Sequence, residues 1–185
     1  MRKLFSQLLH KEMTKDERIV LITGDLGYGL WDRIKIDYPD RFYNVMSSEQ
    51  LMVGAATGLA MEGLIPLVYS ITPFVLYRPF ELLRNYLDHE HIPVKLIGGG
   101  RDKDYGYLGF SHWAEEDIKI LSTLPDIKLY KPKADFNNVI TSESIATFLR
   151  QLLKKDKFGE TIINLASWSP CQLEELIKYS ISLYK

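Results

Sequence analysis

The chain has 185 residues, a usual length for one domain, and its 23 Lys and Arg residues against 24 Asp and Glu residues give a formal net charge of −1. This balance argues against a nucleic-acid binder that relies on phosphate contacts, because such proteins carry an excess of basic residues. The single cysteine, Cys171, excludes an intramolecular disulfide and a cysteine-rich zinc site, and the lack of a membrane-spanning run or signal-peptide core favours a soluble, cytoplasmic protein with one domain over 1–185.

Short apolar runs alternate along the chain with longer segments of helical periodicity. The runs predict strands at Ile19–Thr23, Phe42–Val45, Ile65–Ser70, Val94–Ile97, Ile127–Tyr130 and Thr161–Leu165. The longer segments predict helices at Leu4–Met13, Gln50–Met61, Pro73–Asp88, Ala114–Thr123, Asn138–Lys154 and Gln172–Leu183. This alternation is typical of βαβ units. We therefore predict an α/β fold in three layers, with a doubly wound, mostly parallel sheet and helices on both faces.

Ligands in such sheets bind outside the carboxyl ends of the strands. The loops expected at that edge are Gly24–Leu30, Met46–Glu49, Ile71–Phe74, Gly98–His112 and Lys131–Asp135. The first of them begins with Gly24-Asp25-Leu26-Gly27, which is similar to a phosphate-binding turn. It has neither the Lys-Ser/Thr pair of a P-loop nor the spacing of GxGxxG, so alone it indicates little.

Glu49 opens the predicted helix that follows the second strand, within Ser47-Ser48-Glu49-Gln50. Either a serine caps this helix while Glu49 only favours its first turn electrostatically, or Glu49 carries chemistry. The helix then contains five small residues within one short stretch, namely Gly54, Ala55, Ala56, Gly58 and Ala60. So many small side chains are expected either for tight packing on the sheet or for contact with another subunit.

Three further side chains at this edge admit a structural or a functional role. Phe74, near the start of the third helix, is either a core contact or an aromatic platform for a flat heterocycle. Arg78 follows one turn later on the same face, either as a surface ion pair or as an anion clamp. His112 ends the long glycine-rich loop, and a catalytic role for it requires convergence with Glu49.

In order and spacing, these segments resemble the pyrimidine-binding domain of the transketolase family of thiamine-diphosphate enzymes, over about residues 16–164. The matching motifs are Asp25-Leu26-Gly27, Tyr38–Val45 (similar to FPDRFxNVG), Glu49–Ala60 (EQxMVGxAAGLA), Phe74–Arg78 (FxxxR), Gly109–Ile118 (GxSHxxxEDI), Pro125–Ile127 and Lys131–Asp135. Each motif alone is weak, whereas the ordered set is specific. The pattern is similar to the C-terminal subunit of split, two-subunit transketolases.

The resemblance implies a role for each candidate residue. Glu49 matches the glutamate that bonds the N1′ nitrogen of the cofactor's aminopyrimidine and so promotes loss of the thiazolium C2 proton. Phe74 matches the aromatic residue that packs on the pyrimidine ring, and His112 matches the histidine near the reacting carbonyl. Asp25 and Arg78 are expected to contribute to cofactor binding from a greater distance or to lie at the subunit interface.

Departures from the family pattern bear on the assembly and the substrate. No GDG motif followed by an Asn is present, so the resemblance implies that a separate subunit holds the diphosphate and its Mg²⁺, and we expect no metal ligand in this chain. The family's third domain is also missing, with only a predicted helix at Gln172–Leu183 beyond the matched region. Leu108 takes a position that is usually acidic in the family, and leucine cannot accept a hydrogen bond from a substrate hydroxyl.

The expected protein is therefore one subunit of a heteromer with two copies of each chain, which transfers a two-carbon ketol unit between sugars or sugar phosphates. Two alternatives stay open. The same cofactor would also serve a 2-oxo-acid decarboxylase or an acyloin synthase, which Leu108 and the missing third domain favour. An α/β module that only binds a partner would need no catalytic Glu49.

Overall fold

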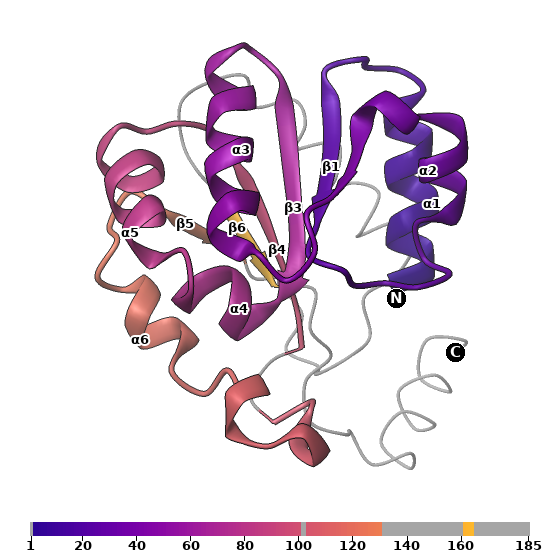
Figure 1. Ribbon diagram of the computed structural model, residues 1–185. Helices are drawn as coiled ribbons and strands as arrows, with labels where there is room; N and C mark the ends of the chain where they lie inside the picture. Colours follow the sequence, from indigo (N-terminus) through magenta and orange to yellow (C-terminus); the bar gives the residue numbers. More distant parts are fainter. Residues whose placement is uncertain (1, 101–102, 131–160, 165–185) are drawn as a thin grey trace, which may run out of the picture.

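Parallel strands form one six-stranded sheet in the computed structural model, which describes residues 2–100, 103–130 and 161–164 (Figure 1). The sheet order is β2-β1-β3-β4-β6-β5, and every neighbouring pair is parallel. The strands are β1 (Ile19–Thr23), β2 (Phe42–Asn44), β3 (Ile65–Ile71), β4 (Lys95–Gly99), β5 (Lys128–Tyr130) and β6 (Thr161–Asn164). The predicted parallel α/β sheet is thus confirmed, with small shifts at the strand ends.

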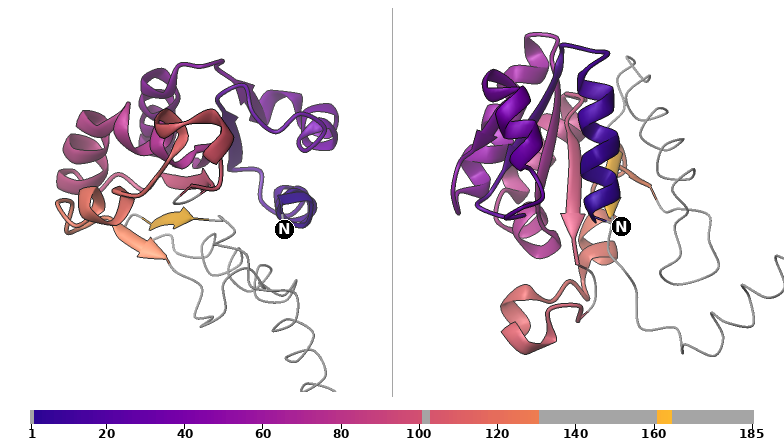
Figure 2. Two further views of the ribbon diagram at one scale, coloured as in Figure 1. Left: turned by 90° about the horizontal axis from the view of Figure 1, so that it is seen from below. Right: turned by 90° about the vertical axis from the view of Figure 1, so that its right-hand side faces the viewer.

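Helices cover both faces of the sheet, which gives the predicted three layers (Figure 2). The helical segments are α1 (Arg2–Met13), α2 (Asp32–Asp37), α3 (Glu49–Met61), α4 (Thr72–Tyr77), α5 (Phe80–Leu82) and α6 (Asp117–Leu121), the 3-10 turns η1 (Pro39–Arg41), η3 (Gly106–Leu108) and η4 (Phe110–His112), and the π-helix η2 (Leu83–His89). None of the helices in the described part of the chain is long and apolar enough to cross a membrane.

The apolar run of β1 supplies a core on each side of the sheet, because successive side chains of a strand point to opposite faces. Leu21 is buried with residues of α1 and α2 on one face, where Phe5 and Ile34 contribute the helical side. Ile22 is buried on the other face among residues of α3, α4, η2 and α6, including Met52 of α3. The sheet is therefore rigidly held on both faces, and its carboxyl edge is positioned by two cores.

Two predicted helices are divided or shortened in the structure, and one short helix was not predicted. The predicted helix Pro73–Asp88 is interrupted between α4 and α5, because Pro79 has no backbone N–H to donate and its ring conflicts with the preceding turn; α5 then continues directly into the π-helix η2. The predicted helix Ala114–Thr123 is shortened to α6, and the six-residue α2 had no counterpart in the prediction. The predicted helices Asn138–Lys154 and Gln172–Leu183 lie outside the described residues.

The chain order of the strands reverses direction at the carboxyl edge of the sheet, between β1 and β3. From β1 the chain passes to β2 on one side and then to β3 on the other, so the connections diverge between β1 and β3. Loops that leave adjacent strands in opposite directions open a ligand-binding crevice at such a point. The start of α3, the start of α4 and the loop that carries η3 and η4 all lie at this edge (Figure 1).

Candidate functional site

Glu49 is a buried carboxylate at the first residue of α3. Its side chain is only 2% exposed, and Ser48, which precedes it at the helix start, makes no side-chain capping hydrogen bond. Capping by Ser48 therefore does not explain the position. One carboxylate oxygen, Oε2, accepts a hydrogen bond of 2.6 Å from Arg78 Nη1, and the other, Oε1, accepts a longer one of 3.5 Å from Ser70 Oγ.

Backbone packing around Glu49 leaves room for its carboxylate. Gly24 follows β1, and a Cβ atom added there would lie 3.2 Å from the carbonyl oxygen of Met46 and 3.5 Å from Glu49 Oε1. Glycine at position 24 thus lets the chain after β1 pass close to the carboxylate without a side chain in contact with it. Glu49 also lies in the first turn of α3, where the helix dipole favours negative charge.

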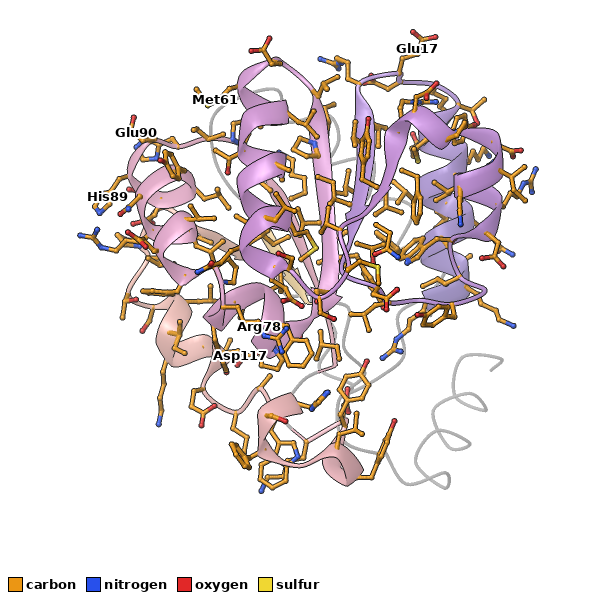
Figure 3. All side chains as sticks on the ribbon, viewed as in Figure 1. Glu17, Met61, Arg78, His89, Glu90 and Asp117 are labelled. Atoms are coloured by element: carbon orange, nitrogen blue, oxygen red, sulfur yellow. The ribbon has the colours of Figure 1, made fainter. Side chains whose placement is uncertain are left out.

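Arg78 joins Glu49 to an aromatic ring. The Cζ atom of its guanidinium lies 3.7 Å from the centroid of the Phe74 ring, so the cation stacks on that ring while it pairs with Glu49. Phe74 lies in α4 and Arg78 just after it, four positions later, as a shared helical face requires. The Arg78 side chain is 44% exposed and reaches beyond the carboxyl ends of the strands (Figure 3).

His112 reaches the same cluster from the loop after β4. Its ring centroid lies 4.9 Å from that of Phe74, at an interplanar angle of 64°. Its Nδ1 atom shares a hydrogen bond of 3.0 Å with Ser111 Oγ, which orients the ring. Successive contacts thus link Glu49 to Arg78, Arg78 to Phe74, and Phe74 to His112.

Asp25 is not part of this chain of contacts. Its backbone adopts φ of 55°, its N–H donates to Asn44 Oδ1 at 2.9 Å, and its carboxylate accepts a bond of 3.2 Å from Asn44 Nδ2. A further hydrogen bond with the Asp25 carboxylate raises the pKa of the exposed Tyr28. These contacts join the ends of β1 and β2 beside a separate hollow of about 350 Å³.

Two further residues, Ser70 and Tyr105, contact members of this cluster. Ser70 is fully buried near the end of β3, and a hydroxyl inside an apolar strand was the signal for it. Tyr105 lies 6.3 Å from the His112 ring, centroid to centroid, and its hydroxyl accepts a hydrogen bond of 2.6 Å from Arg2 Nη2. It therefore ties the His112 loop to α1. Leu108 is 44% exposed in the same loop.

Chemically, the cluster combines a buried anion, a flat cation and an aromatic face. A buried carboxylate holds a strong hydrogen bond to an N–H donor because the surrounding dielectric is low. A flat group that stacks on Phe74 and presents an N–H to Glu49 is what this arrangement accommodates, as the Arg78 guanidinium demonstrates. His112 contacts the Phe74 ring and adds an imidazole, a group able to donate or accept a proton, to this cluster.

Residues 1–154 match the family described as the transketolase, pyrimidine binding domain. A putative transketolase C-terminal section from Methanocaldococcus jannaschii is 30% identical over 149 residues, which cover 80% of this chain and 47% of that protein. A 6-deoxy-6-sulfo-D-fructose transketolase subunit from a Clostridium species is 29% identical over 133 residues, covering 71% of this chain and 41% of that subunit. The chain thus spans less than half the length of either relative.

Among solved structures, a split-gene transketolase described as an inactive beta4 tetramer superposes with a TM-score of 0.74. It is 24% identical in sequence, and the match covers 92% of this chain and 52% of that chain. This likeness supports the parallel α/β fold described above.

Proposed function

Because the chain belongs to the family of transketolase pyrimidine-binding domains, we propose that it is the pyrimidine-domain subunit of a thiamine-diphosphate-dependent, transketolase-like transferase. The observation that carries the proposal is that one planar group, the Arg78 guanidinium, contacts both a buried carboxylate and an aromatic face. Glu49 is 2% exposed, and the guanidinium that bonds it at 2.6 Å also stacks on Phe74 at 3.7 Å. A flat, nitrogen-bearing ring is the class of ligand that such a pair selects.

The residues fit the aminopyrimidine half of thiamine diphosphate. The Arg78 guanidinium is planar and presents N–H donors, and it occupies the space between Phe74 and Glu49. An aminopyrimidine is likewise flat, and its ring nitrogen N1′ would face Glu49 when the ring stacks on Phe74. The stand-in cation thus supports Glu49 and Phe74 as the residues that would hold this ring.

Bound thiamine diphosphate would supply a nucleophilic carbon at C2 of its thiazolium ring. Glu49 would share a proton between its Oε2 atom and N1′ and so set the protonation state of the ring. Phe74 would fix the plane of the ring by stacking. His112, through its Nε2 atom, would donate a hydrogen bond to an oxyanion that develops on the substrate carbonyl, while Ser111 holds its Nδ1 atom.

We further propose that the diphosphate and Mg²⁺ are held by a second polypeptide, in a heteromer with two copies of each chain. The relatives named as a C-terminal section and as a subunit support this division. The exposed apolar side chains at the carboxyl edge, which include Met46, Leu51, Tyr107 and Phe110, fit a surface that a partner covers. Asp25 lies at the same edge and would contribute to that interface.

Reconstitution tests the proposal directly. We expect this chain to bind thiamine diphosphate and Mg²⁺ tightly only when the diphosphate-binding subunit is present, as measured by isothermal titration calorimetry. The pair should then transfer a two-carbon unit from a ketose phosphate to an aldose phosphate. Turnover of pyruvate in place of ketose phosphates would support the alternative of a decarboxylase or acyloin synthase. A pair that assembles but binds no cofactor would overturn the proposal in favour of a non-catalytic module.

A further inference from the structure

Arg78 uses both contacts that a stacked ring ligand would need. Its guanidinium bonds Glu49 Oε2 at 2.6 Å, and its Cζ atom lies 3.7 Å from the Phe74 centroid. The His112 ring also contacts Phe74, edge to face, at 4.9 Å between centroids. While the guanidinium is in this position, a second flat group cannot contact both Glu49 and the same face of Phe74, since the two groups would overlap.

Of the paired residues, Arg78 is the one that can move. Glu49 is 2% exposed and is held at the start of α3, whereas the Arg78 side chain is 44% exposed. Arg78 is the C-cap residue of α4, directly before Pro79. Rotation of its side chain into solvent needs no repacking of either core, because Arg78 belongs to neither core cluster. In the rotated position water would hydrate the cationic head group.

The closed position also protects the fold before assembly. A buried carboxylate without a partner is strongly destabilising, and Arg78 supplies the neutralising charge at Glu49. A ligand that presents an N–H to Glu49 would take over this role. When a ring replaces the guanidinium, the ion pair would give way to a hydrogen bond in which one proton is shared between the Glu49 carboxyl and a ring nitrogen, so the carboxyl would keep a partner.

We propose that Arg78 is a displaceable plug, which fills the ring site of the free chain and leaves it when cofactor and partner assemble. This inference rests on the proposed function, because it assigns the regulation of the same site. An open form populated at about 10% or less weakens ring binding about tenfold or more, since only that fraction of molecules is competent. The diphosphate contacts of the partner would supply the binding energy that moves the guanidinium away.

Binding of thiamine to the isolated full chain tests the plug without the partner, because thiamine carries the ring but no diphosphate. We expect Arg78→Met to bind thiamine about tenfold more tightly than the unaltered chain, because the variant has no guanidinium to close the site and every molecule is then competent to bind. Arg84→Met is the matched control, because Arg84 is exposed in η2 and its guanidinium bonds Asn85, and it should leave the affinity unchanged. Equal or weaker binding by Arg78→Met would overturn the plug.

A measurement on the unaltered chain covers the case in which Arg78→Met unfolds. In nitrogen-15 NMR spectra of arginine Nε–H groups, the Arg78 signal, assigned by its loss in Arg78→Lys, should be ring-shifted and protected from exchange in the free chain. Addition of the partner and thiamine diphosphate should move it to solvent-like values, and an unmoved signal would overturn the plug. The plug and the proposed function can fail separately. A pair that binds thiamine diphosphate while Arg78 stays in place overturns the plug and leaves the proposed function intact. A pair that binds no thiamine diphosphate overturns the proposed function.

Discussion

Glu49 and Arg78 lie 29 positions apart in the chain and form an ion pair of 2.6 Å, whose carboxylate is buried and whose guanidinium is partly exposed. The pair joins the start of α3 to the end of α4, and the stacking of Arg78 on Phe74 extends it to the aromatic ring. Charge, aromatic face and solvent access therefore meet at one edge of the sheet.

Phe74→Leu should weaken the binding of thiamine diphosphate to the reconstituted pair about three- to tenfold, because leucine fills space but offers no ring to stack on. Calorimetric titration gives the affinity. Phe80→Leu is the matched control, since Phe80 packs at the edge of the core rather than at the site and should leave the affinity unchanged. An unchanged affinity for Phe74→Leu would remove Phe74 from the ring site.

His112→Gln should lower kcat by about a hundredfold or more while the cofactor affinity stays the same, because a lost proton donor acts on the reaction and not on ring binding. Ser111→Ala removes only the hydroxyl that bonds Nδ1 and should lower kcat less than about tenfold. Steady-state kinetics and titration of both variants supply the comparison. An equal loss in the two variants would assign the effect to the loop and not to the imidazole.

Gly98→Ala should destabilise the chain by about 1–3 kcal/mol through overpacking. A Cβ at Gly98 would lie 2.5 Å from Thr72 Oγ1 and 3.3 Å from the Thr72 Cα atom, so the start of α4 would have to shift. Gly58→Ala serves as the opposite case, because nothing lies within 4 Å of the added methyl in α3. It should stabilise the chain by about 0.5–1 kcal/mol. Urea unfolding of both variants measures the two changes, and equal stabilities would contradict the packing described here.

Tyr77 should make the stability fall at alkaline pH. Burial, reinforced by the charges of Glu116 and Asp117, raises the pKa of Tyr77 from 10.0 to about 12. Between these two values the phenol ionises in the unfolded chain and stays neutral in the folded one, so the free energy of unfolding decreases as pH rises. Tyr77→Phe removes this contribution. Urea unfolding at about pH 9 and about pH 11 should show a shallower decline for the variant, and identical declines would refute the assignment.

The strands and layers of the fold could be predicted from the sequence, because an apolar run such as Ile19–Thr23 is buried on both faces and leaves few alternatives. Pro79 indicates an interruption of the helix that contains Phe74, but the apolar periodicity on both sides of Pro79 favoured one continuous helix. The six-residue α2 is too short for a periodic pattern to indicate it.

The individual residues of the site could be named from the sequence, but their contacts could not. Arg78 was open to interpretation as a surface ion pair, and its partner Glu49 is identified only once the order of β1 and β3 brings α3 and α4 together. The stacking of Arg78 on Phe74 follows from their helical spacing. The contact of His112 with Phe74 depends instead on the path of a glycine-rich loop, which the sequence does not determine. Asp25 was also named from the sequence, but it lies outside this group of contacts, because its hydrogen bonds hold it to Asn44.

The rate at which the thiazolium C2 proton exchanges with deuterium oxide tests the role of Glu49 most directly, because it needs the assembled pair and the cofactor but no substrate. Proton nuclear magnetic resonance of acid-quenched samples follows this exchange. We predict that Glu49→Gln slows it by about 10²–10⁴-fold, the range of a positioned acid–base group, while the cofactor stays bound. An exchange rate equal to that of the unaltered pair, with the cofactor bound, would contradict the assignment of Glu49 as the activating carboxylate.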